Sequence, residues 1–142
     1  MKVRELMSRS VIRIQADEPV TVAARAMSHY NIGAMPVCGA DGRLCGVVTD
    51  RDIVTRCLAA QREAASTRVG DVMTRQVLTV TPDTEVSAAA KLMGSKQVRR
   101  LPVLENNKLC GMLALADIFS AHGQDAEATA ALGGISSNIS GL

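Results

Sequence analysis

The chain has 142 residues, 47% of them apolar and 21% charged, with a formal net charge of +2, values typical of a globular domain. It has no Trp, and Tyr30 and Phe119 are its single Tyr and Phe, so it lacks the aromatic platforms that bind single-stranded nucleic acid. Its positive and negative charges are interspersed, which leaves no basic tract to bind DNA or anionic lipid. We therefore expect neither a nucleic-acid partner nor a membrane partner.

The first half of the chain predicts short strands alternating with helices. A β-branched run over 11–14 predicts a strand. Asp17 is expected to cap a helix, because apolar residues then recur at helical spacing, at Val20, Ala23, Ala24 and Met27. Strands are predicted at 34–38 and 44–48, joined by a turn rich in Gly and Asp. A second helix is predicted over 50–58.

The second half repeats this order. Residues 3–37 align without a gap with residues 69–103, an offset of 66, and identical pairs include Met7/Met73, Arg9/Arg75, Asp17/Asp83 and Pro36/Pro102. After a one-residue deletion, 43–54 aligns with 108–119. The repeat predicts strands at 100–104 and 109–113 and a helix over 115–122. The expected organisation is repeat 1 at 1–58, a linker at 59–68, repeat 2 at 69–122 and a C-terminal tail at 123–142.

The predicted fold class is α+β, with α/β-type units: two pseudo-symmetric β-α-β-β-α repeats packed as one module. One small sheet with helices on one face leaves its other face exposed, so neither copy is expected to be stable alone. Pairing the copies about a pseudo-two-fold axis would cover these faces and create two related clefts. Clefts at such junctions are where small ligands usually bind.

The segment GVVTDRD (46–52) joins a predicted strand to a predicted helix. Thr49 and Asp52 stand three residues apart, which fits a capping box that satisfies free amides at the helix start. The same hydroxyl and carboxylate also suit a nucleotide, because a helix start favours phosphate and a carboxylate can accept hydrogen bonds from the two hydroxyls of ribose. From the residues alone, both interpretations stand.

The segments NIGAMPV, RLCGVVTDRDIV, QVRRLPV and KLCGMLALADIF carry a family resemblance. Over about 3–122 the chain resembles the CBS domain in its tandem form, the Bateman module, and its layout is most similar to bacterial stand-alone CBS pairs associated with stress or dormancy. The resemblance implies a regulatory module, not an enzyme, that binds AMP, ADP, ATP, S-adenosylmethionine or a similar adenosyl compound between the repeats. Such a compound would be a regulatory ligand, and no catalytic cofactor is expected. The alternative is a structural or partner-binding pair without ligand.

The resemblance also assigns site residues. It places Thr49 on phosphate or ribose and Asp52 on the ribose hydroxyls of the first cleft. It places only Asp117 in the second cleft, because Ala114 stands where the family has Thr or Ser. In family members, basic residues at this strand can reach a nucleotide phosphate, which assigns Arg99 and Arg100 to the ligand. The alternative is that these arginines are solvated residues of an edge strand. The candidate ligand-binding residues are Thr49, Arg51, Asp52, Met35, Pro36, Asp117, Arg99 and Arg100, with Met35 as an apolar wall for adenine.

Two further expectations concern compartment and assembly. The four cysteines have no CxxC spacing and the two histidines lie far apart, so we expect no metal site and a cytoplasmic protein with reduced thiols. The family resemblance implies a homodimer that signals to an unidentified effector protein. Its interface is expected on apolar residues of the helices that follow each motif, which are Ile53, Val54, Leu58, Ile118 and Phe119.

Overall fold

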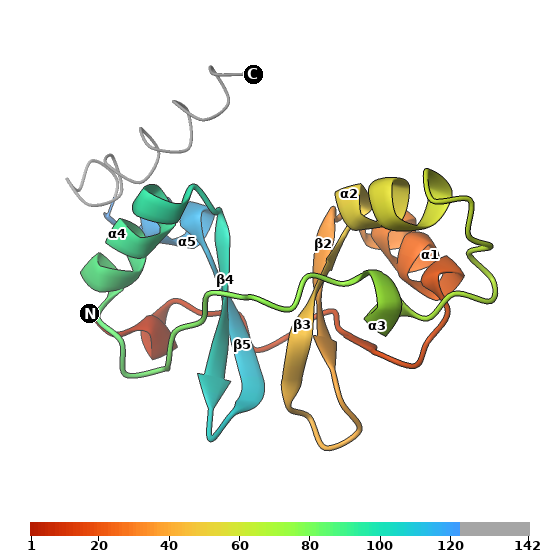
Figure 1. Ribbon diagram of the computed structural model, residues 1–142. Coiled ribbons are helices and arrows are strands. Elements are labelled where there is room, and N and C mark those ends of the chain that lie inside the picture. Colours follow the sequence, from red (N-terminus) through yellow and green to blue (C-terminus); the bar gives the residue numbers. More distant parts are fainter. Residues whose placement is uncertain (123–142) are drawn as a thin grey trace. The chain divides into compact units, whose positions relative to one another are not determined.

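The computed structural model describes residues 1–122, and contacts divide the chain into two compact units (Figure 1). The first-repeat unit comprises Ile12–Val77 with Asn107–Leu109. The second-repeat unit comprises Met1–Val11, Leu78–Asn106 and the described residues from Cys110 onward. The predicted tail at 123–142 lies outside the described residues.

The first-repeat unit is built on a three-stranded sheet of order β1-β2-β3. β1 runs parallel to β2, and β3 runs antiparallel to β2, with Met35 opposite Val48. The helix after β3 begins as an α-helix and continues as a π-helix. The elements are β1 (Ile14–Gln15), α1 (Val20–Tyr30), β2 (Ala34–Cys38), β3 (Leu44–Thr49), α2 (Asp50–Asp52), the π-helix η2 (Ile53–Leu58) and α3 (Val69–Val72).

One apolar core holds this unit together. It takes residues from α1, from the sheet, from η2 and from α3, so the helices and the sheet bury a common interior. The alternation along β2 turns Met35 and Val37 into this core, and Val48 on β3 joins them. The helical face predicted for α1 is narrower than expected, because Val20, Ala23 and Met27 are buried whereas Ala24 is exposed.

The second-repeat unit has the same order of long helix, hairpin and final helix, with a smaller sheet. β4 and β5 form a two-stranded sheet, and Val80 makes an isolated parallel bridge to Val103 where the first repeat has β1. The elements are the 3-10 helix η1 (Val3–Glu5), α4 (Val86–Lys96), β4 (Arg100–Glu105), β5 (Lys108–Ala114) and α5 (Leu115–His122). Mixed helices and strands in two repeats confirm the predicted α+β class.

Each repeat's opening segment packs in the unit of the other repeat. Thr74, after α3, exchanges two backbone hydrogen bonds with Val47 of β3, with N···O distances of 2.8 and 2.9 Å. Ser8, after η1, pairs in the same way with Met112 of β5, at 2.8 and 2.9 Å. A unit therefore contains most of one repeat together with the first residues of the other.

Two glycines permit these backbone pairings. A Cβ atom at Gly46 would lie 2.4 Å from the Thr74 carbonyl oxygen, and one at Gly111 would lie 2.9 Å from the Ser8 carbonyl oxygen. Both distances are below ordinary van der Waals contact, so the absence of a side chain is what lets each opening segment approach its strand.

Two expectations about side chains are wrong. Asp17 does not cap its helix, and neither does its counterpart Asp83 in the second repeat: the N-cap residues are Pro19 and Glu85, and neither makes a side-chain capping hydrogen bond. Ile53 and Ile118 are also not available for an interface, because their helices turn them into the apolar cores, where they are 8% and 1% exposed.

In residues 1–122 no helix is both long and apolar enough to cross a membrane. The cytoplasmic location stays a prediction.

Candidate functional site

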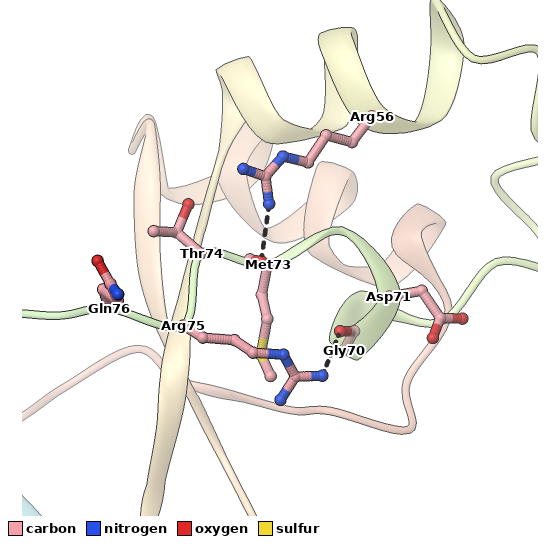
Figure 2. A pocket seen from close by; sticks show the side chains of 7 residues that line it. All are labelled: Arg56, Gly70, Asp71, Met73, Thr74, Arg75 and Gln76. Atoms are coloured by element: carbon pink, nitrogen blue, oxygen red, sulfur yellow. Dashed lines mark hydrogen bonds between the residues drawn. The ribbon is translucent and has the colours of Figure 1, made fainter.

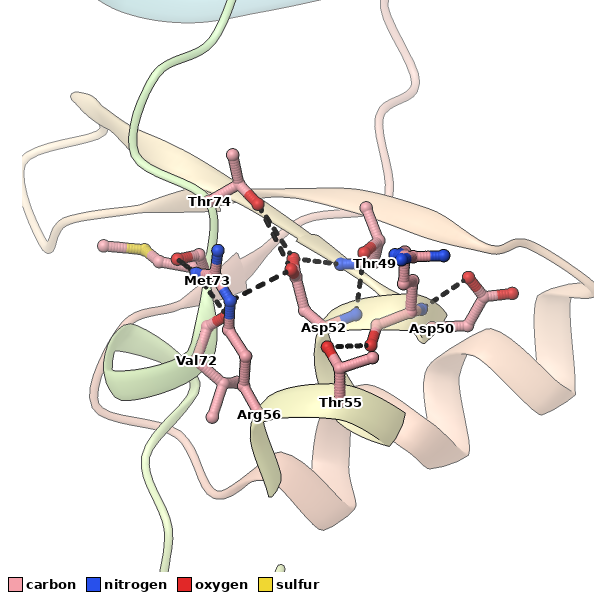
Figure 3. A network of polar contacts seen from close by, with 9 residues as sticks. Thr49, Asp50, Asp52, Thr55, Arg56, Val72, Met73 and Thr74 are labelled. Carbon is pink, nitrogen blue, oxygen red and sulfur yellow. Dashed lines mark hydrogen bonds and ion pairs between the residues drawn. The ribbon is translucent and has the colours of Figure 1, made fainter. Parts of the chain in front are cut away.

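Thr49 ends β3 and serves as the N-cap of α2. Its side-chain oxygen accepts a hydrogen bond from the backbone N–H of Asp52 at 3.0 Å, and the Asp52 carboxylate accepts one from the backbone N–H of Thr49 at 3.1 Å (Figure 3). This reciprocal pair confirms the capping box predicted from the three-residue spacing. The geometry fixes both polar side chains at the point where the strand becomes a helix.

The Asp52 carboxylate has further partners from outside its own helix turn. The Thr74 hydroxyl donates to it, at 3.1 Å from Oδ2 and 3.2 Å from Oδ1. The Arg56 Nε lies 3.8 Å from Oδ1. Asp52 is only 6% exposed, so a charged group is held in the interior by hydrogen bonds and an opposite charge. Thr74 and Arg56 come from different segments, which makes Asp52 a junction between them.

Arg56 extends this junction to the backbone after α3. Its Nη1 donates to the carbonyl oxygen of Met73 at 3.1 Å and lies 3.5 Å from that of Val72 (Figure 3). The guanidinium therefore connects η2, the Asp52 carboxylate and two carbonyl groups. It fixes the segment that leads to Thr74 against the helix.

A cavity of about 510 Å³ lies beside this junction (Figure 2). Arg75 lines it and donates through Nη2 to the Gly70 carbonyl oxygen at 3.4 Å, and Asp71 is paired with Arg62 at 3.6 Å. With two arginines and one already paired carboxylate, the lining suits an anionic group. The lining residues are Arg56, Gly70, Asp71, Met73, Thr74, Arg75 and Gln76.

The corresponding motif of the second repeat is less complete. The Asp117 carboxylate accepts a hydrogen bond from the backbone N–H of Ala114 at 3.3 Å, but Ala114 has no hydroxyl to return one. Ser8 occupies the position that Thr74 has in the first-repeat unit, and its hydroxyl donates to the Ser10 carbonyl at 3.3 Å instead. Asp117 is half-buried, in contrast to the buried Asp52.

The other predicted site residues fall in both units. Arg51 is exposed at the start of α2, and Met35 and Pro36 are buried on β2, with Met35 only 1% exposed. Arg99 and Arg100 are exposed, just before and at the start of β4 in the second-repeat unit. The first-repeat unit thus brings Thr49, Arg51 and Asp52 together. The roles of all eight residues in ligand binding stay predictions.

Thr74 and Arg56 were not predicted as site residues from the sequence. A signal for Thr74 was available, since a hydroxyl residue stands between the identical Met and Arg pairs in both Met7-Ser8-Arg9 and Met73-Thr74-Arg75. Arg56 stands four residues after Asp52, a spacing at which opposite charges meet on a helix. In residues 1–122, no three His, Cys, Asp or Glu side chains gather closely enough to hold a metal ion.

Comparisons with known proteins show which proteins this chain is similar to. A curated relative, Hypoxic response protein 1 of Mycobacterium tuberculosis, is 36% identical over 115 residues, covering 81% of this chain and 80% of the relative. A crystal structure of Hypoxic Response Protein I with two coordinated zinc ions superposes with a TM-score of 0.77 and 34% identity, covering 85% of this chain and 98% of the other.

Two further solved structures contain adenosyl compounds. CBSX2 in complex with AMP matches with a TM-score of 0.75 and 26% identity, over 87% of this chain and 96% of that one. The CBS domain pair of MJ0100, in complex with 5-methylthioadenosine and S-adenosyl-L-methionine, matches with a TM-score of 0.73 and 25% identity, over the same shares. The family model of the CBS domain matches twice, at residues 3–59 and 69–123. The chain therefore belongs to the CBS domain family and carries a tandem pair of CBS domains.

Proposed function

We propose that this chain is a regulatory module that binds an adenosyl ligand, such as AMP, ADP, ATP or S-adenosylmethionine, at the start of α2. The observation that carries the proposal is the buried Asp52 carboxylate, held beside the Thr49 hydroxyl at the end of β3. The adenosyl ligands of two related CBS pairs support it. The proposal assigns no reaction and no catalytic cofactor to the chain.

The chemistry of the site favours a ribose next to an anionic group. The two hydroxyls of ribose are hydrogen-bond donors, and a carboxylate offers two acceptor oxygens. The cavity lined by Arg56 and Arg75 adjoins Asp52 through Thr74, so a phosphate attached to that ribose would find guanidinium donors nearby. Arg51, Met35 and Pro36 are further proposed contacts in the first-repeat unit, and Asp117, Arg99 and Arg100 are proposed contacts in the second-repeat unit.

Titration calorimetry with AMP, ATP, S-adenosylmethionine and adenosine tests the proposal. Asp52→Asn keeps the size of the side chain but removes the charged acceptor, and we expect it to weaken binding about ten- to a hundredfold. Asp117→Asn is the matched control and should weaken binding much less. Circular dichroism of both variants checks that they remain folded.

The opposite ranking would move the ligand to the second repeat. If the wild type binds none of these compounds, the function is instead that of a structural or partner-binding CBS pair. A zinc titration in the same series tests whether this chain binds zinc, the metal that is coordinated in a related structure.

We also propose that the module forms a homodimer through η2. Val54 and Leu58 are 54% and 59% exposed and stand four residues apart, which places two large apolar side chains on one side of the helix. Leu58→Asp should shift the sedimentation coefficient from dimer to monomer, whereas Val22→Asp, at an exposed position of α1, should not. A monomeric wild type at micromolar concentration would contradict this assembly. The effector that receives the signal would be a separate protein.

A further inference from the structure

The Asp52 carboxylate is already occupied by groups of the protein itself. Oδ2 accepts hydrogen bonds from the Thr49 N–H and the Thr74 hydroxyl, and Oδ1 contacts the same hydroxyl and faces the Arg56 guanidinium. At 6% exposure, Asp52 offers almost no surface to a ligand. A ribose that uses both carboxylate oxygens must therefore displace one of these partners.

Of the three partners, Thr74 is the one that can leave at least cost. The Thr49 N–H belongs to the backbone where β3 meets α2, and it cannot turn away without breaking the capping box. The Arg56 guanidinium is held by the carbonyl groups of Val72 and Met73. The Thr74 hydroxyl, by contrast, leaves by rotation about one side-chain bond.

The surroundings of Thr74 fit such a rotation. Its backbone stays fixed, because its N–H and carbonyl are both bonded to Val47 of β3. Its side chain is half-buried and lines the 510 Å³ cavity, which gives the hydroxyl a place to turn into (Figure 2). The contact can therefore open and close without unfolding the strand pairing.

We propose that the Thr74 hydroxyl is an internal competitor for the ribose site: it donates to the Asp52 carboxylate and is displaced from it by a vicinal diol. This inference rests on the proposed function. Thr74 then sets the affinity for ligands that carry two neighbouring hydroxyls, because each binding event must first break the Thr74–Asp52 contact.

The second repeat provides a natural contrast. Ser8 has the same position relative to β5, but its hydroxyl is bonded to its own segment at Ser10 and makes no hydrogen bond to Asp117. The competitor therefore belongs to the first repeat, and Ser8→Ala is a matched control that removes the equivalent hydroxyl.

The test is the affinity of Thr74→Val, which keeps the shape of the side chain and removes its hydroxyl. We expect AMP to bind this variant about three- to tenfold more tightly than it binds the wild type, because the ligand no longer displaces a hydrogen bond to a carboxylate. Thr74→Ser, which keeps the hydroxyl, and Ser8→Ala should bind AMP as the wild type does. The dideoxy analogue of AMP, which lacks both ribose hydroxyls, should show no gain with Thr74→Val.

Several results would overturn the proposal. Unchanged or weaker AMP binding by Thr74→Val means that Thr74 is neutral or contacts the ligand, and an equal gain for the dideoxy analogue means that no diol displacement occurs. Thr74→Ala provides the same comparison if the Val variant does not fold. If wild type and Thr74→Val both fail to bind any adenosyl compound, the proposed function and the competition fall together. If the wild type binds and Thr74→Val shows no gain, only the competition falls.

Discussion

The two motifs that start α2 and α5 stand at equivalent positions of the two repeats, yet they differ in how many hydrogen bonds and charges their carboxylates meet. Asp52 is buried beneath Thr49, Thr74 and Arg56, whereas Asp117 accepts from the backbone of Ala114 and stays half-buried. The carboxylate is common to both, so it does not by itself make a site. The hydroxyl and the cation around it decide whether it is held in the interior.

The opening segments of the two repeats also differ in the ion pairs that hold them. η1 is attached to the second-repeat unit by ion pairs, between Arg4 and Asp83 and between Lys2 Nζ and Glu85 at 2.7 Å. At the offset of 66, the counterparts in the first-repeat unit are Gly70 with Asp17 and Arg68 with Pro19, which cannot form these pairs. Side-chain charge therefore helps to hold the first residues of repeat 1 in the second-repeat unit, and these two ion pairs have no counterpart in the first-repeat unit.

The largest expected effect on stability comes from adding a side chain at the two glycines where the opening segments pair with β3 and β5. Gly46→Ala would place a methyl group against the Thr74 carbonyl, and we expect it to lower the free energy of unfolding by about 3 kcal/mol. Gly111→Ala should cost less, because the nearest atom there is the flexible Met7 thioether at 2.8 Å and the Ser8 carbonyl is farther away, at 2.9 Å. Urea denaturation measures both. Equal, small losses would mean that the opening segments are not held at these distances.

The next largest effect is the difference in stability cost between replacing Asp52 and replacing Asp117, measured without added ligand. Asp52→Asn should lower the free energy of unfolding by about 2 kcal/mol, since it weakens hydrogen bonds to a buried charged acceptor and leaves Arg56 without its counter-charge. Asp117→Asn should cost under about 1 kcal/mol, because Asp117 has fewer contacts and more exposure to water. Thermal unfolding of the two variants checks the order. A larger loss at Asp117 would reverse the contrast between the motifs.

A reciprocal exchange of the cap residues tests whether the hydroxyl makes the difference. Thr49→Ala should cost about 1 kcal/mol by removing the N-cap oxygen, and Ala114→Thr should gain a similar or smaller amount by completing the second capping box. Chemical denaturation of both variants and of the double variant gives the comparison. If Ala114→Thr gives no gain in stability, the two motifs differ in backbone geometry as well as in this side chain.

The smallest effect is the pH dependence of the η1 attachment. Arg4 lowers the pKa of the Asp83 carboxyl, and Lys2 lowers the pKa of the Glu85 carboxyl, through a hydrogen bond and charge attraction in both cases. A carboxyl with a lowered folded-state pKa contributes stability above its unfolded value, and this contribution is lost as the pH falls through the folded value. We expect the melting temperature to fall slightly more steeply below about pH 5 in the wild type than in Asp83→Asn/Glu85→Gln.

Salt provides the control for that prediction. These ion pairs are exposed, so 1 M NaCl should reduce the difference between the wild type and the double variant. A difference that persists in high salt would assign the acid sensitivity to other carboxyls.

Local sequence patterns were sufficient for most of the secondary structure. β2 has the predicted bounds, and the helix after each hairpin begins at the predicted residue. The Thr49–Asp52 capping box also follows from spacing alone, because it involves residues only three apart. These features depend on side-chain periodicity and on hydrogen bonds within one helical turn, both of which a sequence displays directly.

The tertiary structure decided what surrounds the motif. Thr74 reaches Asp52 from 22 residues away, and it does so because α3 packs in the unit of the preceding repeat. The burial of Ile53 depends likewise on where its helix settles on the sheet, not on its position in an apolar run. Asp17 has the spacing of a helix cap, yet the helix begins beyond it, at Val20. Such contacts depend on the path of the chain between distant segments, and a single sequence displays the partners without showing which of them meet.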